Sequence, residues 1–252
     1  MSGVAGGRSP GLPRPPGRRP PYLPHRDSSA MVLTRYGFQN CIGAFFEMST
    51  SDARAILPAH LEPMEKQHTR SVLAVLAFQF TESEVGAYDE LVLAIITPPL
   101  VEPGKPLPKA AFYPFAVATS TRAAREHAIE RWHLPHHMAD LDFEFEGSDD
   151  SRTVRVREGD TPVLDMTVTS HEHHEQTNPY HAFTVDDESG TRYKVNIFMQ
   201  GPHSEHEFEE GSLTLHEHPV TSGLTLDDVE TIPFREEWYR AGLQTFEELE
   251  EI

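Results

Sequence analysis

Residues 132–139 read WHLPHHMA, and this octapeptide says more about the fold than any other part of the sequence. A proline disfavours the helical conformation of the residue before it, so Pro135 ends any preceding helix and favours an extended chain. His136 and His137 are therefore predicted to form an extended pair of adjacent imidazoles directly after a helix.

That helix is predicted over residues 121–132. Ala124, Ala128 and Trp132 recur at i, i+4 spacing, which places them on one apolar face. Ser120 is a candidate N-cap, because its hydroxyl can accept a hydrogen bond from a free backbone N–H of the first turn.

Most of the remaining sequence has the pattern of β-strands. Glu158-Gly159-Asp160 predicts a hairpin turn between two strands. The last twenty residues, from Ile232, include a Trp-containing segment that we interpret as helix-like. Strands outnumber helices, so the predicted class is α+β and β-rich. The predicted strands are residues 37–48, 71–80, 88–97, 112–120, 153–157, 161–170, 192–200 and 211–216.

Length and composition indicate a globular protein. The 252 residues fit one large or two small domains, and 38% apolar residues with 9% aromatics can form a core. No apolar run approaches the roughly 18 residues that cross a membrane. The single cysteine, Cys41, excludes a disulfide framework, and a reducing cytoplasm is the default location.

The net charge of −19 is unevenly distributed. Residues 1–30 carry five arginines and one aspartate, which leaves −23 for the rest of the chain. Such an acidic surface repels nucleic acid and anionic membranes, so neither is expected as a partner. The acidity fits a preference for cationic ligands, and equally fits solubility or adaptation to a salty medium.

Residues 1–30 contain seven prolines and no apolar periodicity. We expect this Pro/Arg-rich extension to be disordered and residues 31–252 to form a single domain. The extension lacks the apolar core of a secretory signal peptide. It could be an organelle transit peptide, although its prolines argue against an amphipathic helix, or the true start could be Met31.

Four segments together resemble the acetoacetate decarboxylase-like superfamily over roughly residues 38–245. They are the octapeptide, ARAILPAHLEPM (53–64), VGAYDE (85–90) and residues 213–243. The resemblance implies curved antiparallel sheets or a barrel that encloses an apolar pocket, with few short helices. It also implies a homo-oligomer.

The resemblance places His136 and His137 where the family has two adjacent lysines. One of those lysines forms an imine with the substrate, and its neighbour lowers its pKa. Imidazole cannot form this imine, so imine-dependent decarboxylation is predicted to be absent. The sequence departs from the family in two further ways: Ile129 stands where an arginine is usual, and residues 40–48 contain no arginine to hold a substrate carboxylate.

Histidine can still transfer protons, because its ordinary pKa is about 6.5. We therefore interpret His136, His137 and Glu90 as a catalytic acid–base set, with Glu90 matching the family's site glutamate. The alternative is that both histidines fill space left by a lost function. The resemblance also implies that Glu130, Tyr88 and Trp132 bind the substrate.

Another lysine could replace the missing amine. The chain has four, Lys66, Lys105, Lys109 and Lys194. Lys105 and Lys109 lie in the Pro-rich stretch before the helix and could fold over the pocket. Ordinary surface lysines are the competing interpretation.

Paired histidines at period-two spacing suggest a separate metal site. His171 with His173, and His216 with His218, would each project to one side of a strand. Two such strands side by side could offer four imidazole ligands to a metal. The same pattern fits a solvated polar strand face, since the apolar residues of both segments fall on the opposite face.

Three functional hypotheses follow. The first is a lyase-type enzyme that acts on a small keto acid or polyketide-like carbonyl compound through histidine acid–base chemistry, without a cofactor. The second is a non-catalytic small-molecule-binding or scaffolding protein of the same fold. The third is a metal-dependent enzyme that uses the paired histidines.

Overall fold

The structure, a computed structural model, describes residues 33–252. The disordered extension expected for residues 1–30 lies outside the described residues. The helical elements are α1 (Thr50–Ile56), α2 (Arg122–Trp132) and the short 3-10 turns η1 (Pro219–Thr221) and η2 (Leu226–Asp228). The strands are β1 (Thr34–Ser49), β2 (Glu65–Gln67), β3 (Arg70–Glu82), β4 (Tyr88–Thr97), β5 (Ala111–Thr119), β6 (Asp142–Gly147), β7 (Ser151–Glu158), β8 (Thr161–Thr169), β9 (His174–Val185), β10 (Arg192–His206), β11 (Ser212–Leu215), β12 (Arg235–Phe246) and β13 (Glu250–Glu251).

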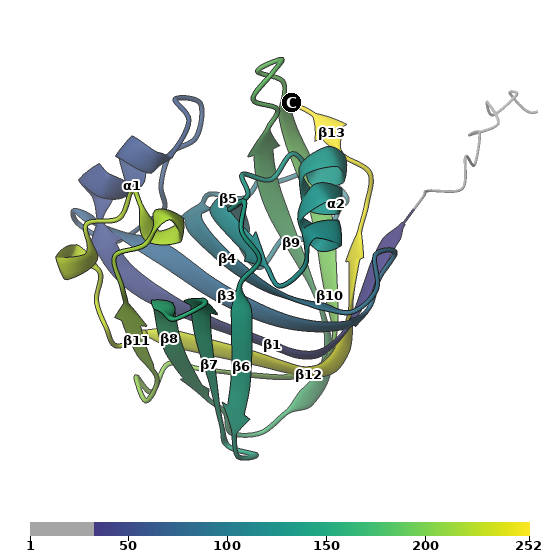
Figure 1. The fold of residues 1–252 in the computed structure, drawn as a ribbon. Coiled ribbons are helices and arrows are strands. Elements are labelled where there is room, and N and C mark those ends of the chain that lie inside the picture. The colour runs from purple at the N-terminus through teal and green to yellow at the C-terminus, as the bar shows by residue number, and fades with distance from the viewer. Residues whose placement is uncertain (1–32) are drawn as a thin grey trace, which may run out of the picture. The chain divides into compact units, whose positions relative to one another are not determined.

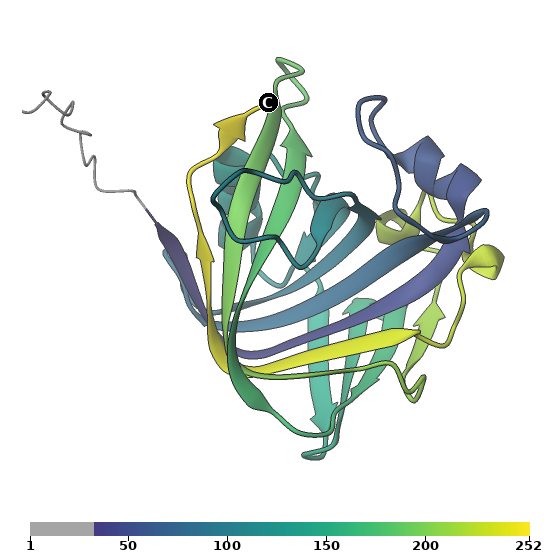
Figure 2. The same ribbon diagram turned by 180° about the vertical axis from the view of Figure 1, so that it is seen from behind.

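Seven strands close into a barrel (Figures 1 and 2). Their hydrogen-bonded order is β1-β12-β10-β9-β5-β4-β3, and pairing of β3 with β1 completes the ring. Neighbouring strands are antiparallel except β5 and β9, which meet in parallel at Ala111 and Phe112. The expected β-rich α+β fold with a barrel is confirmed.

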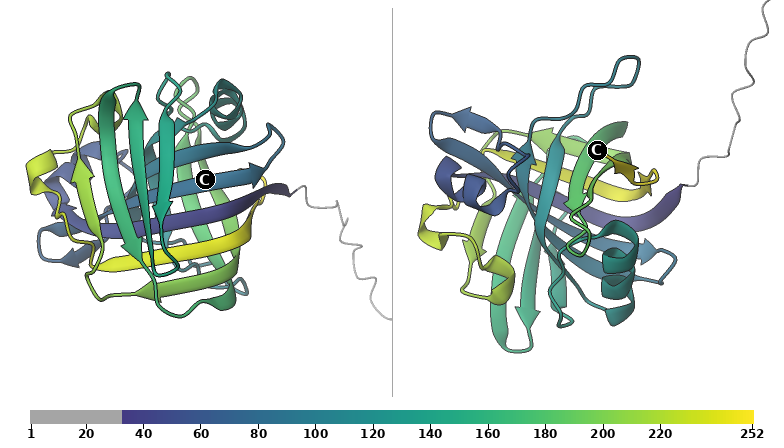
Figure 3. Two further views of the ribbon diagram at one scale, coloured as in Figure 1. Left: turned by 60° about the horizontal axis from the view of Figure 1, so that its bottom comes forward. Right: turned by 90° about the horizontal axis from the view of Figure 1, so that it is seen from above.

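The remaining long strands form a second sheet in the order β11-β8-β7-β6. Its strands run across those of the barrel (Figure 3, left). The turn that joins β7 to β8 is the predicted hairpin turn, in which Glu158 pairs with Thr161 and Gly159 has a φ of 59°. Glycine adopts this left-handed conformation without steric cost.

Alternating side chains divide the barrel strands between two cores. On β4, Val92 and Ala94 belong to the core inside the barrel. Leu91 and Leu93 of the same strand belong to the core between the barrel and the second sheet. A strand buried on both faces needs apolar residues at successive positions, which explains the run LVLAII over residues 91–96.

Helix α2 packs against the core inside the barrel at one end (Figure 1). The buried Trp132 donates a hydrogen bond from Nε1 to the Tyr36 hydroxyl over 2.8 Å. Its ring also lies 4.7 Å from that of Phe246. No helix among residues 33–252 is both long and apolar enough to cross a membrane.

The N-cap of α2 differs from the prediction. Thr121 caps the helix, because its hydroxyl accepts from the Ala124 amide at 3.3 Å. The Ser120 hydroxyl instead accepts from the Asp89 amide at 2.8 Å. Either residue is a suitable cap, and the additional bond to β4 decides which one is used.

The prediction of a helix-like segment after Ile232 is wrong. Residues 235–246 form β12, which pairs with β1 on one side and β10 on the other. Trp238 packs between the sheets and Tyr239 packs inside the barrel. Two long neighbouring strands satisfy the backbone hydrogen bonds of this segment, and the local sequence does not reveal those neighbours. Strands β6 and β9 and the short strands β2 and β13 were not predicted either.

A fully buried carboxylate joins the barrel to the second sheet. Glu236 of β12 accepts hydrogen bonds from the backbone amides of Thr169 (2.7 Å), Glu210 (3.1 Å) and Gly211 (2.9 Å). These donors lie at the end of β8 and just before β11. Buried amides need acceptors, so Glu236 fixes how β8 and β11 meet β12.

We predict that Glu236→Leu destabilises the protein by about 3 kcal/mol, because it leaves the buried amide of Gly211 and the part-buried amides of Thr169 and Glu210 without an acceptor. Urea unfolding followed by tryptophan fluorescence measures this loss. The exposed Glu248→Leu is the matched control and should cost less than about 1 kcal/mol. An equal loss in both variants would contradict the bridging role.

Candidate functional site

The histidine pair lies in an extended segment beside β5. The Val117 amide donates to the Pro135 carbonyl at 3.0 Å, and the His137 amide donates to the Val117 carbonyl at 2.8 Å. Between these bonds, His136 forms a parallel bridge with Val117. The predicted extended conformation after Pro135 is confirmed.

His136 is held neutral. Its Nδ1 lies 2.9 Å from the His137 carbonyl, which can only accept, so Nδ1 carries the ring proton. The buried Nε2 has no hydrogen-bond partner in residues 33–252. Burial lowers the pKa of His136 to about 4, despite the opposing hydrogen bond to the His137 backbone. At neutral pH this residue offers a lone pair and no charge.

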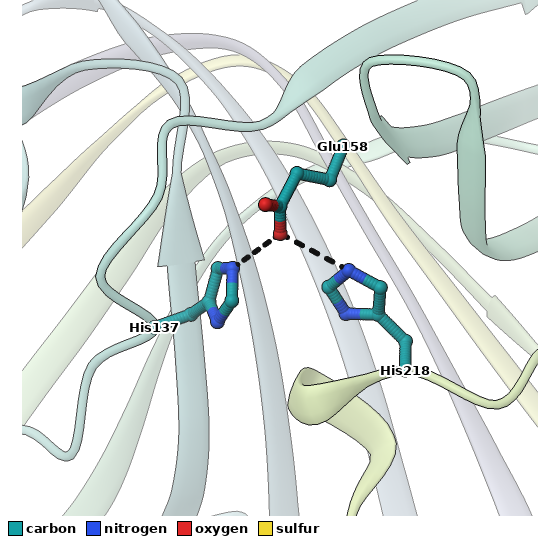
Figure 4. Close-up of side chains that lie close together, drawn as sticks. All are labelled: His137, Glu158 and His218. Atoms are coloured by element: carbon teal, nitrogen blue, oxygen red, sulfur yellow. Dashed lines mark hydrogen bonds and ion pairs between the residues drawn. The ribbon is translucent and has the colours of Figure 1, made fainter.

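His137 belongs to a triad with Glu158 and His218 (Figure 4). Glu158 Oε2 lies 2.7 Å from His137 Nε2 and 3.1 Å from His218 Nε2. The hydrogen bond from His137 is the main cause that lowers the pKa of Glu158. The two imidazole rings meet edge to face at 5.2 Å. One carboxylate oxygen therefore holds two imidazoles in place.

The protonation of the triad follows from its neighbours. The Val220 amide donates to His218 Nδ1 at 3.2 Å, so the Nδ1 lone pair is occupied and the proton lies on Nε2. His218 thus donates to Glu158. The ionised carboxylate can only accept, so His137 also donates from Nε2.

Two histidines and one carboxylate also form a common metal-binding set. The three ligand atoms lie within 4.8 Å of one another. A metal-bound histidine normally donates a hydrogen bond from its other nitrogen, whereas His218 Nδ1 accepts one. This acceptance favours a hydrogen-bonded triad over a metal centre.

The histidine pair lines a hollow of about 330 Å³. The surrounding side chains are mostly apolar, and they come from β5, the segment after α2 and turn η1. They are Phe115, Ala116, Pro135, Met138, Pro219 and Val220. An apolar hollow with a few polar groups is the usual form of a small-molecule site.

The other predicted site residues lie elsewhere. Glu90 follows the alternation of β4 and faces the barrel interior, where burial raises its pKa to about 8. It makes no side-chain hydrogen bond to His136 or His137 in residues 33–252, and the carboxylate that contacts His137 is Glu158. Tyr88 is buried in the barrel core against Phe80.

The two predicted substrate-binding residues of α2 have different environments. Trp132 is buried and engaged with Tyr36. Glu130 is exposed on the helix surface. Neither lines the hollow beside His137, so their assignment to substrate binding stays a prediction from the resemblance.

A second, smaller cavity of about 60 Å³ lies inside the barrel. Its walls are mainly apolar, and its polar side includes Tyr180, Tyr239 and Glu237. The Tyr180 hydroxyl lies 3.1 Å from that of Tyr239 and donates to Glu237 Oε2 at 3.2 Å. Buried Cys41 also lines this cavity, and burial raises the pKa of its thiol well above the ordinary value.

Cations compensate the buried charge of Glu237. Its carboxylate lies 2.8 Å from Arg235 Nη2, 3.3 Å from Lys109 Nζ and 3.8 Å from His203 Nε2. Burial alone would raise the pKa of Glu237, but these three neighbours outweigh it and hold the pKa at about 2. Lys109 therefore forms ion pairs with two carboxylates, since its Nζ also lies 2.5 Å from Glu205.

The four histidines suggested as a metal site do not meet within residues 33–252. His171 lies 3.3 Å from Glu210, and His173 packs against Trp238. His216 lies 3.8 Å from an aspartate of β8, and His218 belongs to the triad. Strand β8 ends at Thr169, before His171 and His173. The suggestion assumed that these two histidines lie on a strand, and they do not.

Sequence reasoning missed Glu158, His218 and Glu237. Glu158 was interpreted only as a turn residue, and His218 as half of a paired motif. Glu237 was hidden by the helical interpretation of β12, because EEWYR (236–240) does not alternate between polar and apolar residues and so gives no signal of a strand.

Comparisons with known proteins agree with this architecture. The family model described as acetoacetate decarboxylase (ADC) matches residues 18–225. Acetoacetate decarboxylase from Legionella pneumophila subsp. pneumophila str. Philadelphia 1 has a TM-score of 0.61 at 12% identity, with 87% of each chain covered. A comparison with curated proteins gives no match.

Two other solved structures are similar. The enduracididine biosynthesis enzyme MppR complexed with pyruvate has a TM-score of 0.58 at 12% identity, covering 92% of this chain and 95% of that one. An acetoacetate decarboxylase-like enzyme from Sphingomonas wittichii RW1 has a TM-score of 0.58 at 12% identity, covering 87% and 92%. At such identities the likeness concerns the fold. The family model spans most of the sequence, and the chain therefore belongs to the acetoacetate decarboxylase family.

Proposed function

We propose that this protein is a lyase-type enzyme that acts on a small keto acid or related carbonyl compound through histidine acid–base chemistry. The observation that carries the proposal is the 2.7 Å contact between His137 Nε2 and Glu158 Oε2 beside an apolar hollow. A carboxylate that holds an imidazole in one tautomer is a recurrent element of general base catalysis.

In the proposed reaction, His137 Nδ1 removes a proton from the carbon next to the substrate carbonyl. Glu158 stabilises the imidazolium that forms. The electron pair of the broken C–H bond expels a leaving group from the adjacent carbon, and the imidazolium protonates that group. His218 acts as a positioning residue, because its bond to Oε2 restrains the carboxylate.

An imine mechanism is disfavoured at every lysine of the described chain. Each ammonium forms an ion pair: Lys66 with Glu47, Lys105 and Lys194 with Glu102, and Lys109 with Glu205. For Lys194, hydrogen bonds and ion pairs with Glu102 and Glu250 outweigh burial and raise the pKa, and a protonated amine is not a nucleophile.

The substrate class is supported by the structural neighbours. MppR is described in complexes with pyruvate and with the condensation product of pyruvate and imidazole 4-carboxaldehyde. A 2-oxo acid is therefore the first substrate to test.

A second candidate is a non-catalytic binding protein. The barrel cavity is the observation that favours it. The Glu237 carboxylate that lines this cavity is bound by Arg235, Lys109 and Tyr180, so it is not free to act as an acid or a base. Binding of small carbonyl compounds without proton exchange would support this alternative.

We also propose a homo-oligomer in a reducing cytoplasm. The one cysteine, Cys41, is buried and unpaired, which fits a chain that needs no oxidising compartment. A monomeric mass by light scattering would contradict the oligomer.

We predict that His137→Gln and Glu158→Gln each slow deuterium incorporation next to the carbonyl of 2-oxo acids by roughly 10²–10⁴-fold. Proton NMR in D₂O measures the rate. His174→Gln, an exposed histidine paired only with Glu172, is the matched control and should exchange at the parent rate. Equal rates in all three variants would contradict the proposed base.

We predict no covalent adduct after borohydride reduction with 2-oxo or 3-oxo acids, because no neutral primary amine faces the substrate. Intact mass spectrometry checks this. A stable adduct, or robust acetoacetate decarboxylation, would contradict the loss of imine chemistry, and peptide mapping would name the lysine.

Glu90 is proposed to stay protonated at neutral pH and so not to act as a base, because burial raises its pKa from 4.5 to about 8. Between these pH values the folded protein keeps a proton that the unfolded chain has lost. Stability should therefore fall as the pH rises through this window.

We predict that Glu90→Gln removes this dependence. At pH 8–9 the variant should be more stable than the parent by roughly 3 kcal/mol, and at pH 4–5 the two should be similar. Urea unfolding at both pH values measures the difference, with the exposed Glu84→Gln as control. A stabilisation of Glu90→Gln that is equal at both pH values would contradict the assignment.

A further inference from the structure

A third pocket, of about 230 Å³, lies on the outer face of the barrel and is not part of the site described above. The Pro-rich segment 98–110 runs across this face of β9 and β10 (Figure 2). Apart from its polar groups the lining is apolar, with Leu100, Pro106 and Pro108 from the Pro-rich segment and Phe198 from β10.

The floor of this pocket carries two polar atoms without partners. His181 and Asn196 are directly opposed on β9 and β10. Their chain neighbours Tyr180, Ala182 and Val195 belong to the barrel core, so both side chains face outward into the pocket. His181 is only 5% exposed, and neither its Nδ1 nor Asn196 Oδ1 has a hydrogen-bond partner in residues 33–252.

The neighbouring carboxylate fixes the orientation of the amide. Asn196 Nδ2 lies 2.6 Å from Glu247 Oε2. A carboxylate only accepts, so the NH₂ group faces Glu247 and the amide oxygen is left as an unused acceptor. Burial is the main cause that lowers the pKa of His181, so its ring is neutral and can also accept.

The charges around the pocket leave one anion uncompensated. Lys105 and Lys194 both pair with Glu102, and Lys194 also pairs with Glu250 at 2.9 Å. Glu247 has no lysine, arginine or histidine partner in the described residues. The hydrogen-bond acceptors that remain available in the pocket are thus His181, Asn196 and the Glu247 carboxylate. The two nearby lysines are already neutralised by their ion pairs.

We propose that this pocket binds a small primary ammonium compound with a short apolar body. The ammonium group has three N–H donors, and Asn196 Oδ1, His181 Nδ1 and the Glu247 carboxylate are the acceptors that match them. The apolar wall covers the carbon chain. The proposal does not depend on the function proposed for His137.

The test uses n-butylammonium as probe, with n-butanol and butyrate as neutral and anionic analogues. Binding is followed in the full-length protein by calorimetry and by the NMR signals of the Asn196 amide and the His181 ring. We expect saturable binding of the amine alone, with shifts at both residues. Saturation by butanol of equal strength would overturn the ammonium assignment, and no saturable binding of any probe would overturn the site.

Glu247→Gln should weaken amine binding by roughly tenfold or more, since it removes a charge-assisted contact but keeps the acceptor for Asn196. Glu248→Gln, the neighbouring exposed carboxylate, is the matched control and should bind as the parent does. Asn196→Leu removes the amide acceptor and should also weaken amine binding. If that variant does not fold, the comparison of Glu247→Gln with Glu248→Gln tests the proposed site. His137→Gln should bind the amine unchanged, which separates this site from the proposed function.

Discussion

Closure of the barrel by β1 is the constraint on which the rest of the structure depends. This strand pairs with β12 along one edge and with β3 along the other. Its last residue, Ser49, caps α1. Because both edges are used from Asn40 to Phe45, the side chains of this part of β1 alternate in fixed inward and outward directions. The same alternation then passes through the ring and separates the core inside the barrel from the core beneath the second sheet.

Three acidic residues of the barrel strands have physically different environments. The carboxylate of the fully buried Glu236 accepts hydrogen bonds from three backbone amides. Glu237 keeps its charge because Arg235 and Lys109 surround it. Glu90 has neither, and burial shifts its pKa until the proton stays bound. Glu236 and Glu237 are adjacent in β12 and point in opposite directions. Glu236 therefore lies at the junction of the sheets, and Glu237 lines the barrel.

The candidate site combines segments that are distant in the sequence. His137 comes from the segment after α2, Glu158 from the β7–β8 hairpin and His218 from the cap of η1. The hairpin turn sets the position of Glu158, and the Val220 amide sets the tautomer of His218. Together they fix the position of the Glu158 carboxylate beside His137. The outer pocket near Glu247 is formed separately, by the Pro-rich segment and the C-terminal residues.

The sequence by itself determined the β-rich class, the helix that ends before Pro135, the hairpin at Gly159 and the extended histidine pair after that helix. These features depend on local periodicity, turn conformation and residue chemistry, all of which can be recognised in short segments. Only the tertiary structure decided that residues 235–246 form a strand, that Glu158 and not Glu90 contacts His137, and that the paired histidines disperse. Strand partners, burial and the pKa values that follow from burial are properties of contacts between distant segments. No local pattern contains them, because the same residues would have other neighbours in another fold.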